Sequence, residues 1–239
     1  SPSEFSLTSP PDEALFTSTG ITFNWQSSFD VDIYDSVAYR LHIESGDTNF
    51  VIETSDTSFF IENFIDNQIY HWSVVAYDLN GGATNNIGGP RMFIINLIND
   101  TPSIVGLMAP NEGSTQSDLT PNFAWTNSYD PDPLDMVSYN LSWWEPFSTD
   151  IQSVNIDSNG FTPNGYLMDN AIYQWRIKSE DLSGAASFSD TAYFYTDAYA
   201  EPPVNFSTIA PAPDASMSST VVNFKWFSTI DPDPNELIK

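Results

Sequence analysis

The chain has 239 residues, of which 41% are apolar and 15% aromatic, so it can form hydrophobic cores and does not resemble a disordered chain. Its 32 Asp and Glu residues against 6 Lys and Arg residues give a net charge of −26, which excludes a nucleic-acid binder and disfavours an anionic membrane surface, because both need basic side chains. The absence of Cys excludes disulfides, thiolate metal sites and Cys nucleophiles, and no apolar run reaches the roughly 18 residues of a membrane span.

Each repeat opens with a segment that lies between two Pro residues. Because Pro has no backbone donor, such a segment suits an edge strand and its exit. The second Pro precedes a Trp by 15 residues in every copy (25 − 10, 125 − 110 and 226 − 211), and these Trp residues are 100 and 101 residues apart (125 − 25 and 226 − 125). The chain therefore repeats one module. The three opening segments are residues 2–10, 102–110 and 203–211.

This repeat predicts the domain organisation. We expect module one at residues 1–98, module two at residues 99–199, and a partial module three at residues 200–239 that holds only the first two strands of the pattern. A segment of about 40 residues is too short to fold alone. The chain also starts without Met, so we expect both ends to be cuts in a longer protein.

Apolar residues alternate along short segments, as expected for half-buried strands. Ile21, Phe23 and Trp25 share one face of such a segment, and Tyr39 and Leu41 share a face of the next. Gly-containing turns separate the segments, and no stretch follows the helical period of about 3.6 residues, so the pattern predicts an all-β sandwich. Strands are expected at residues 21–25, 37–43, 69–76 and 91–95 and at 122–125, 137–143, 172–177 and 192–195, with Trp25, Trp72, Trp125, Trp175 and Trp226 in the cores.

A Trp on the second strand, a Tyr on the third and a Tyr that begins a later strand together resemble the fibronectin type III family. The strongest likeness lies at Tyr70 and Tyr173, which follow Phe64 and Leu167 by six residues, as in the tyrosine corner of that family. The resemblance implies tandem seven-stranded, immunoglobulin-like sandwiches. It also implies that each of these Tyr hydroxyls bonds back to the chain.

The repeated Trp followed by spaced acids resembles a variant of this family that is common in long bacterial secreted and surface proteins. Those proteins use such modules as spacers and adhesion elements. The resemblance therefore implies a non-catalytic, extracellular segment, secreted or at the cell surface, that serves as a spacer or adhesion rod.

Acidic residues follow the repeated Trp at offsets of 5, 7 and 10 in all three copies, for example at 30 − 25, 32 − 25 and 35 − 25. We call residues 30–35, 130–135 and 231–236 the first, second and third acid loops. Several carboxylates on one short loop repel each other unless water, a cation or a distant base separates them. Hard oxygen ligands at this spacing suit Ca²⁺, which binds about six to eight oxygens.

Two further groups of oxygens are expected beside the acid loops. In the implied fold, each acid loop shares one end of its module with a later turn, which carries Asp78 or Asp181, and the linker at residues 96–101 crosses beside the second acid loop. We therefore predict Ca²⁺ at or near the joints, where it would stiffen the connection to the neighbouring modules of the same chain. The candidate ligands are Asp30, Asp32, Asp35, Asp78, Asp130, Asp132, Asp135, Asp181, Asn99 and Asp100.

A simpler interpretation of the acid loops is a solvated turn. Asp followed by Pro favours type I turns without any metal, and acid-rich loops are common at this overall charge. The first loop has Val31 where the others have Pro131 and Pro232, yet it keeps all three acids. That comparison favours a role for the charges, and both interpretations stay open.

No catalytic residue is predicted. His42 and His71 are the only His residues, and both fall within predicted strands. The sequence contains no Gly-x-Ser-x-Gly motif, and exposed acid loops lack the apolar surroundings that raise a carboxyl pKa for acid catalysis. We therefore expect the chain not to be an enzyme.

A second function of a different class concerns Trp144. If Tyr139 and Leu141 face the core, Trp143 is also inward and Trp144 points outward, where an exposed Trp stacks on a sugar ring or on a neighbouring module. Trp144 is therefore the candidate ligand or interface aromatic. The alternative function is a carbohydrate-binding accessory module of a secreted glycan-degrading enzyme, with a glycan or a cell-surface protein as the partner.

Overall fold

The computed structural model describes residues 1–32, 35–46, 48–234, 236 and 238. The chain divides into two compact units, of which the first comprises Ser1–Thr101 with Asp130–Met136 and the second Pro102–Tyr129 with Val137–Lys239. The second acid loop therefore packs with the first unit. The module boundaries at residues 98/99 and 199/200 stay a prediction.

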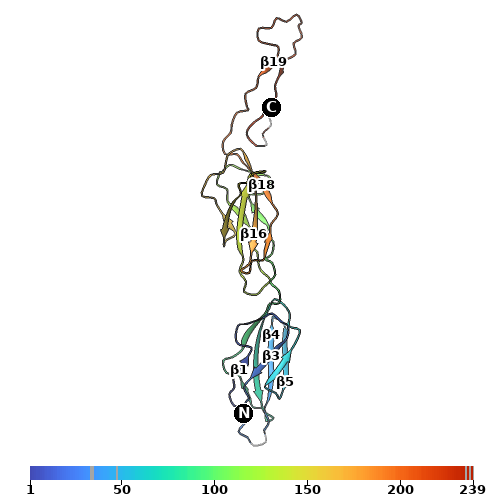
Figure 1. Cartoon of the computed structure of the whole chain (residues 1–239), viewed down its shortest axis with the longest axis vertical. Helices are drawn as coiled ribbons and strands as arrows, with labels where there is room; N and C mark the ends of the chain where they lie inside the picture. The colour runs from blue at the N-terminus through green and yellow to red at the C-terminus, as the bar shows by residue number, and fades with distance from the viewer. Residues whose placement is uncertain (33–34, 47, 235, 237, 239) are drawn as a thin grey trace. The chain divides into compact units, whose positions relative to one another are not determined.

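The first unit contains two mainly antiparallel sheets (Figure 1). One sheet has the order β1-β3-β6, and the other has the order β2-β9-β7-β4-β5, with β8 also paired to β7. The small strand β2 runs parallel to β9, whereas the other pairs are antiparallel. The strands are β1 (Leu7–Ser9), β2 (Ala14–Phe16), β3 (Ile21–Trp25), β4 (Ala38–Ser45), β5 (Thr48–Thr54), β6 (Ser58–Ile61), β7 (Gln68–Tyr77), β8 (Ala83–Asn85) and β9 (Arg91–Ile95).

The second unit repeats this strand order. One sheet is β10-β12-β15, and the other is β11-β18-β16-β13-β14 with β17 paired to β16. The strands are β10 (Leu107–Ala109), β11 (Ser114–Gln116), β12 (Phe123–Trp125), β13 (Ser138–Trp144), β14 (Gln152–Ile156), β15 (Gly160–Phe161), β16 (Ala171–Glu180), β17 (Ala186–Phe188) and β18 (Ala192–Thr196). The regular structure of the described residues is all β, as predicted, and none of it is a helix long and apolar enough to cross a membrane.

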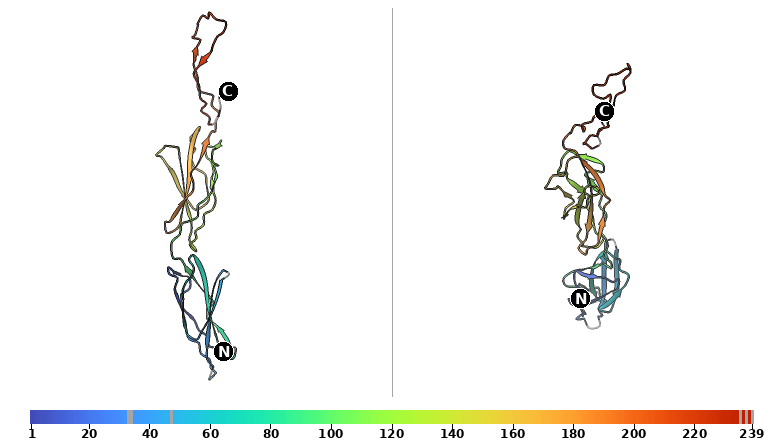
Figure 2. Two further views of the ribbon diagram at one scale, coloured as in Figure 1. Left: turned by 90° about the vertical axis from the view of Figure 1, so that its right-hand side faces the viewer. Right: turned by 45° about the horizontal axis from the view of Figure 1, so that its top comes forward.

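Each core lies between its two sheets and is built from the alternating residues of the long strands. Figure 2 shows the strands of each unit from two further directions. Phe23 on β3 contacts Trp72 on β7 with ring centroids 5.1 Å apart, and Phe123 on β12 contacts Trp175 on β16 at 5.2 Å. These four side chains are at most 1% exposed. Burying a Phe of this kind stabilises the fold by about 1.5–3 kcal/mol relative to leaving it in water.

The prediction that the Tyr hydroxyls bond back to the chain is confirmed in both modules. The backbone N–H of Ile65 donates to the Tyr70 hydroxyl at 3.1 Å, and the N–H of Met168 donates to the Tyr173 hydroxyl at 3.0 Å. Both Tyr rings are buried. This bond fixes the turn that leads into β7 and into β16, and that turn carries part of the candidate site.

The third repeat differs from the prediction at Trp226. Its two short strands, β19 (Thr208–Ala210) and β20 (Lys225–Trp226), pair with each other in an antiparallel register. The expectation that Trp226 lies in a core is wrong, because its side chain is 58% exposed and Phe224 beside it is 69% exposed. A pair of strands buries a face only where a second sheet packs against it. No second sheet covers these rings within the described part of the chain.

Candidate functional site

The described residues of the three acid loops form the same local hydrogen bonds. In each, the first Asp accepts a hydrogen bond from the backbone N–H two residues later, at 2.9, 2.9 and 3.2 Å. The third acid donates its own N–H to the carbonyl oxygen of the middle Asp at 3.1, 3.2 and 3.3 Å. These local bonds are those of an Asx turn, so they account for the loop shape without a ligand. The acids concerned are Asp30, Asp32 and Asp35; Asp130, Asp132 and Asp135; and Asp231, Asp233 and Glu236.

The geometry also brings the carboxylates of each loop together. In every acid loop, one oxygen from each of the three acids lies within 4.8 Å of the others. Their burial differs: Asp132 is 2% and Asp233 4% exposed, whereas Asp32 in the first loop is exposed. Like charges this close repel strongly where water is excluded, and buried charges need a partner. The middle acids of the second and third loops are therefore carboxylates that burial leaves in need of a partner.

The first acid loop lies beside the turn that carries Asp78. Asp35 accepts hydrogen bonds from the backbone N–H of Leu79 at 3.1 Å and from the side-chain amide of Asn80 at 2.6 Å. Asp78 is 7% exposed and accepts the backbone N–H groups of Asn80 and Gly82 at 2.9 and 2.7 Å. The loop and the turn thus share one end of the module.

A positive group lies among these acids in the structure. The Ser1 ammonium nitrogen is 3.1 Å from Asp30 Oδ2 and 3.7 Å from Asp78 Oδ2. The backbone N–H of Asp32 first, and the Ser1 ammonium next, lower the pKa of Asp30 below its usual range. The hydrogen bond to Asp30 raises the pKa of the Ser1 amine in turn.

The second acid loop, within the first unit, receives a chain of hydrogen bonds from the other end of module one. The Asn67 amide donates to Asp100 Oδ2 at 2.7 Å, and the Asp100 backbone N–H donates to Asp132 Oδ2 at 2.9 Å. We call Asn67, Asp100 and Asp132 the first oxygen cluster. Two of its oxygens, Asn67 Oδ1 and Asp132 Oδ1, are buried and accept no hydrogen bond from the described residues. Such orphaned oxygens are costly unless a donor or a cation meets them.

The second unit repeats this arrangement. The Asn170 amide donates to Glu201 Oε2 at 2.9 Å, and the Glu201 backbone N–H donates to Asp233 at 3.1 and 3.2 Å. We call Asn170, Glu201 and Asp233 the second oxygen cluster. Its members lie 103, 101 and 101 residues after those of the first (170 − 67, 201 − 100 and 233 − 132). Asn170 Oδ1 is again buried without a hydrogen bond from the described residues.

An Asp next to each cluster holds the linker in place. Asp66 Oδ1 accepts the backbone N–H groups of Asn67 at 2.9 Å and Leu97 at 2.6 Å. Asp169 Oδ1 accepts the corresponding groups of Asn170 and Ala198 at 3.1 and 2.7 Å. Each Asp therefore connects the segment that follows β9 or β18 to the turn before β7 or β16 through its hydrogen bonds.

Repulsion among the acids is visible in the pKa values of the second unit. Burial first, and the charges of Asp233, Asp169 and Asp231 next, raise the pKa of Asp197. The Asn170 amide lowers the pKa of Glu201, but the carboxylate of Asp233, burial and the charge of Asp169 outweigh it, so the pKa of Glu201 is raised. A negative charge is thus disfavoured around the second oxygen cluster, whereas a cation is favoured.

Comparison with known proteins bears on the fold and not on this site. No family model matches the chain, and no curated protein matches it. Among solved structures, it is similar to a crystal structure of chicken CNTN1 FN1-FN3 domains, with a TM-score of 0.45 and 13% sequence identity over 88% of this chain and 72% of that chain. The assignment of the fold therefore rests on the strand order of each module and on the Tyr hydroxyl bonds.

Three strands face a four-stranded sheet in the order β1-β3-β6 against β9-β7-β4-β5, and module two has the same order. This is the order of a seven-stranded sandwich of the immunoglobulin class. Both modules are fibronectin type III-like sandwiches. The additional short strands β2, β8, β11 and β17 pair at the margins of the larger sheets.

The remaining predicted residues take up separate positions on these fibronectin type III-like modules. Asp181 is 5% exposed and accepts the backbone N–H groups of Gly184 and Ala185 at 2.6 and 2.9 Å, so it mirrors Asp78. Asn99 is exposed, and its amide donates to the Asp100 carbonyl oxygen at 3.4 Å. Among the predicted ligands, Asp100 and Asp132 are joined by a hydrogen bond between the linker and the second acid loop.

Trp144 lies on the outer face of the larger sheet of module two, where it is half-buried. Its indole N–H donates to Gln174 Oε1 at 3.0 Å, and the Arg176 guanidinium lies 5.8 Å from its ring centroid. Side chains of the same sheet thus already contact this ring.

Asn67 and Asn170 are not in the predicted ligand set, although the implied fold brings Asp66 and Asn67 toward the second acid loop. A signal for them exists, because an Asp-Asn pair begins four residues before each corner Tyr (70 − 66 and 173 − 169). The local pattern could not reveal that these amides reach acids 33 and 31 residues further along the chain.

Proposed function

We propose that this chain is a non-catalytic spacer segment of a secreted or cell-surface protein, in which Ca²⁺ binds at the acid loops and stiffens the connection between consecutive modules. The supporting observation is the repeated oxygen cluster. Asn67, Asp100 and Asp132 in the first unit recur as Asn170, Glu201 and Asp233 in the second, with the same hydrogen-bond order. A turn that needed only its shape would not require this second set of side chains.

The ligand chemistry supports Ca²⁺ rather than a softer metal. The candidate ligands are carboxylate and amide oxygens without a thiolate or an imidazole, and Ca²⁺ takes about six to eight oxygens from such groups. The second acid loop supplies three carboxylates, from Asp130, Asp132 and Asp135. Asn67, which is linked to Asp132 by hydrogen bonds through Asp100, supplies a buried amide oxygen. A bound cation would meet the oxygens that burial leaves without donors and would offset the repulsion among the acids.

The non-catalytic part of the proposal rests on the position of the potential bases. His42 lies on β4 and His71 on β7, both within strands of the larger sheet of module one, so neither belongs to an acid loop. The acids of the loops are engaged with backbone N–H groups of their own turns. This arrangement holds the carboxylates in fixed positions, as a cation site needs.

The test is to remove Ca²⁺ from the full 239-residue chain. With EGTA, we expect a lower melting temperature and a larger or broader distribution of maximum dimensions in small-angle X-ray scattering than with Ca²⁺. A ligand at a hundred times its Kd stabilises the folded state by about 2.7 kcal/mol, which is enough for a clear shift. Mg²⁺ at equal concentration should restore less, because it prefers fewer protein ligands in a tighter octahedral shell.

The matched variants are Asp132→Asn, which keeps the size of a nearly buried side chain, and Asp157→Asn, which removes one charge from an exposed site outside the clusters. Asp132→Asn should reduce the response to Ca²⁺, whereas Asp157→Asn should leave it unchanged. Identical melting and scattering with Ca²⁺ and with EGTA in the unmodified chain would refute the proposal.

A further inference from the structure

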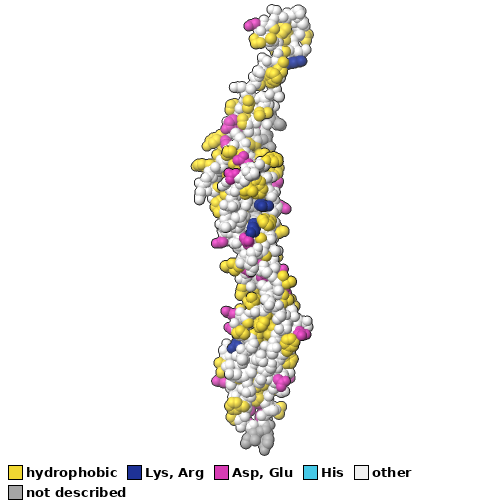
Figure 3. Space-filling view, viewed as in Figure 1, with side chains coloured by type: hydrophobic (Ala, Val, Ile, Leu, Met, Phe, Trp, Pro, Cys, Tyr) yellow, Lys and Arg dark blue, Asp and Glu magenta, His cyan; other side chains and the backbone are white. Residues whose placement is uncertain are grey.

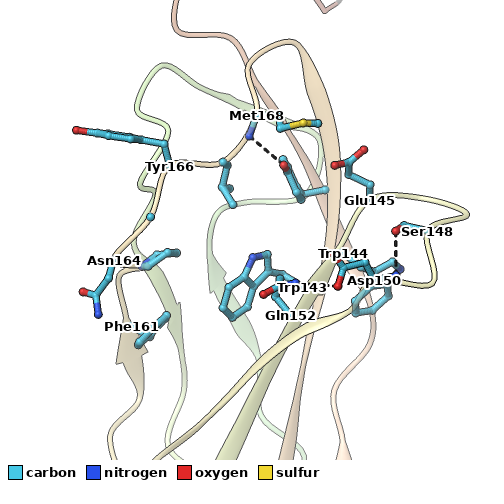
Figure 4. A pocket seen from close by; sticks show the side chains of 14 residues that line it. Trp143, Trp144, Glu145, Ser148, Asp150, Gln152, Phe161, Asn164, Tyr166 and Met168 are labelled. Atoms are coloured by element: carbon cyan, nitrogen blue, oxygen red, sulfur yellow. Dashed lines mark hydrogen bonds between the residues drawn. The ribbon is translucent and has the colours of Figure 1, made fainter.

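Module two contains a hollow at the end of β13. Its volume is about 370 Å³, and it lies where β13 ends and where the segment between β15 and β16 begins (Figure 4). This volume falls within the usual range for small-molecule sites, roughly 300–1,000 Å³. Aromatic and polar side chains line it together, including Trp143, Phe161, Tyr166, Glu145 and Asp150.

Trp143 forms the centre of the lining. Its ring contacts Phe123 at 5.8 Å and Phe161 at 6.0 Å between centroids, so the core holds it in position while it stays half-buried. At the matching place in module one stands Ile43, which is 0% exposed. Where module one has the smaller, buried Ile43, module two therefore has the larger indole of Trp143, which is partly exposed at the surface.

Two longer connections shape the walls of the hollow. The β4–β5 connection joins the paired residues Ile43 and Phe50, seven positions apart, whereas the β13–β14 connection joins Trp143 and Gln152, nine positions apart. The second segment is also longer by one residue. Phe59 on β6 precedes Tyr70 by 11 residues (70 − 59), whereas Phe161 on β15 precedes Tyr173 by 12 (173 − 161). These additions occur in the two segments that border the hollow.

The two walls differ in chemistry. Figure 4 shows Phe161, Asn164 and Tyr166 on one side of Trp143 and Glu145, Ser148 and Asp150 on the other. Tyr166 is 84% exposed, so its ring is available to a ligand. The carboxylates and amides can accept or donate hydrogen bonds at the rim, next to flat apolar faces.

This combination selects a class of ligand. Aromatic rings stack against the C–H face of a sugar ring, and carboxylate and amide oxygens accept hydrogen bonds from its hydroxyl groups. The lining contains two acids and no Lys or Arg, in a chain of net charge −26, so anionic sugars and phosphates are repelled. A neutral saccharide satisfies both walls, whereas a purely apolar ligand would leave the polar wall without partners.

We propose that this hollow, the Trp143 pocket, is a binding site for a neutral saccharide ring. The proposed site lies within module two and includes no acid-loop residue, so it does not depend on Ca²⁺ there. Trp143, Trp144 and Tyr166 all line it. The Trp144 indole N–H already donates to Gln174, so we assign the stacking contacts to Trp143 and Tyr166.

The test is a screen of neutral oligosaccharides against the full chain in EGTA, so that the result is independent of the proposed Ca²⁺ function. Positive glycans are then measured by titration calorimetry. Tyr166→Ala changes an exposed side chain and should weaken binding by roughly tenfold. Trp143→Ile restores the residue that module one packs at this place and should abolish binding.

The control is Phe50→Ala, which removes a half-exposed aromatic from β5 of module one and should leave binding unchanged. All variants are compared by thermal melting, and Tyr166→Ala should melt as the unmodified chain does. The proposal is overturned if no neutral glycan binds, if Tyr166→Ala and Trp143→Ile bind as tightly as the unmodified chain, or if the pocket takes up tetramethylammonium but not sugars, which would make it a cation cage.

Discussion

At the scale of single residues, the corner Tyr70 contributes both to core packing and to the turn before β7. The ring of Tyr70 stacks on Phe93 with centroids 5.2 Å apart, and its hydroxyl accepts the Ile65 backbone N–H at 3.1 Å. The same turn presents Asp66 and Asn67, which hold the linker and Asp100. A residue that belongs to the fold therefore also positions the candidate site.

Tyr70→Phe should destabilise module one by about 1–3 kcal/mol, because the partly buried Ile65 N–H loses its acceptor while the ring stays in place. Thermal or urea unfolding of the full chain checks this value. Tyr77→Phe, in the same strand, is the control, because the Tyr77 ring is half-buried and packs under Arg40. A smaller effect for Tyr70→Phe than for Tyr77→Phe would contradict the role given to the corner hydroxyl.

Residue-level prediction worked where a side chain alternates along a long strand and failed where the outcome depends on a missing or altered neighbour. Trp25, Trp72, Trp125 and Trp175 are buried, as expected, because two sheets enclose them. Trp226 carries the same local pattern but is exposed, since burial needs a second sheet that a local pattern cannot supply.

At the scale of elements, the acid loops combine a self-sufficient turn with a set of distant partners. The Asx bonds of Asp130 and Asp132 could be anticipated from the Asp spacing. The implied fold also predicted that the linker with Asp100 crosses beside Asp132. The individual bonds that join Asn67, Asp100 and Asp132 could not be predicted, because they depend on how the linker folds back. The long strands were predictable because their side chains alternate along the sequence. The three-residue β2 was not, because it pairs parallel with β9 through backbone atoms and leaves no side-chain pattern.

The raised pKa values beside the third acid loop predict a pH dependence. A carboxyl whose pKa is raised in the folded state costs stability while it is ionised, and this cost falls as the pH drops through the folded pKa. Asp197 and Glu201 are such groups. Without Ca²⁺, the Glu201 backbone N–H, which donates to Asp233, should therefore be better protected from hydrogen exchange at about pH 5 than at about pH 7.

With Ca²⁺ present, this gain in protection should disappear, because the cation already offsets the repulsion. Carboxyls with lowered pKa values act in the opposite direction, but Asp30 and Asp118 start from 3.8, so their contribution is lost only at more acidic pH. Glu201→Gln should show high protection at both pH values. Protection that falls from neutral to mildly acidic pH in EGTA would contradict this account.

At the scale of the whole molecule, charge is the dominant feature. The 32 acidic and 6 basic residues leave a large excess of negative charge, and Lys and Arg side chains are few on the face shown in Figure 3. Such a charge keeps a protein soluble but also repels like-charged groups that the fold brings together. The chain places three acids within 4.8 Å in each of three loops, which concentrates that repulsion where a divalent cation relieves it.

Calcium titration of the full chain by isothermal calorimetry tests the central claim most directly. The account predicts about two Ca²⁺ ions bound at the oxygen clusters, with affinity of order 10⁻⁴–10⁻³ M or tighter. The heat from these two sites should be lost in the Asp132→Asn/Asp233→Asn double variant, which leaves the first acid loop unchanged, and kept in Asp157→Asn. No heat of binding in the unmodified chain, or equal binding in the double variant, would contradict it.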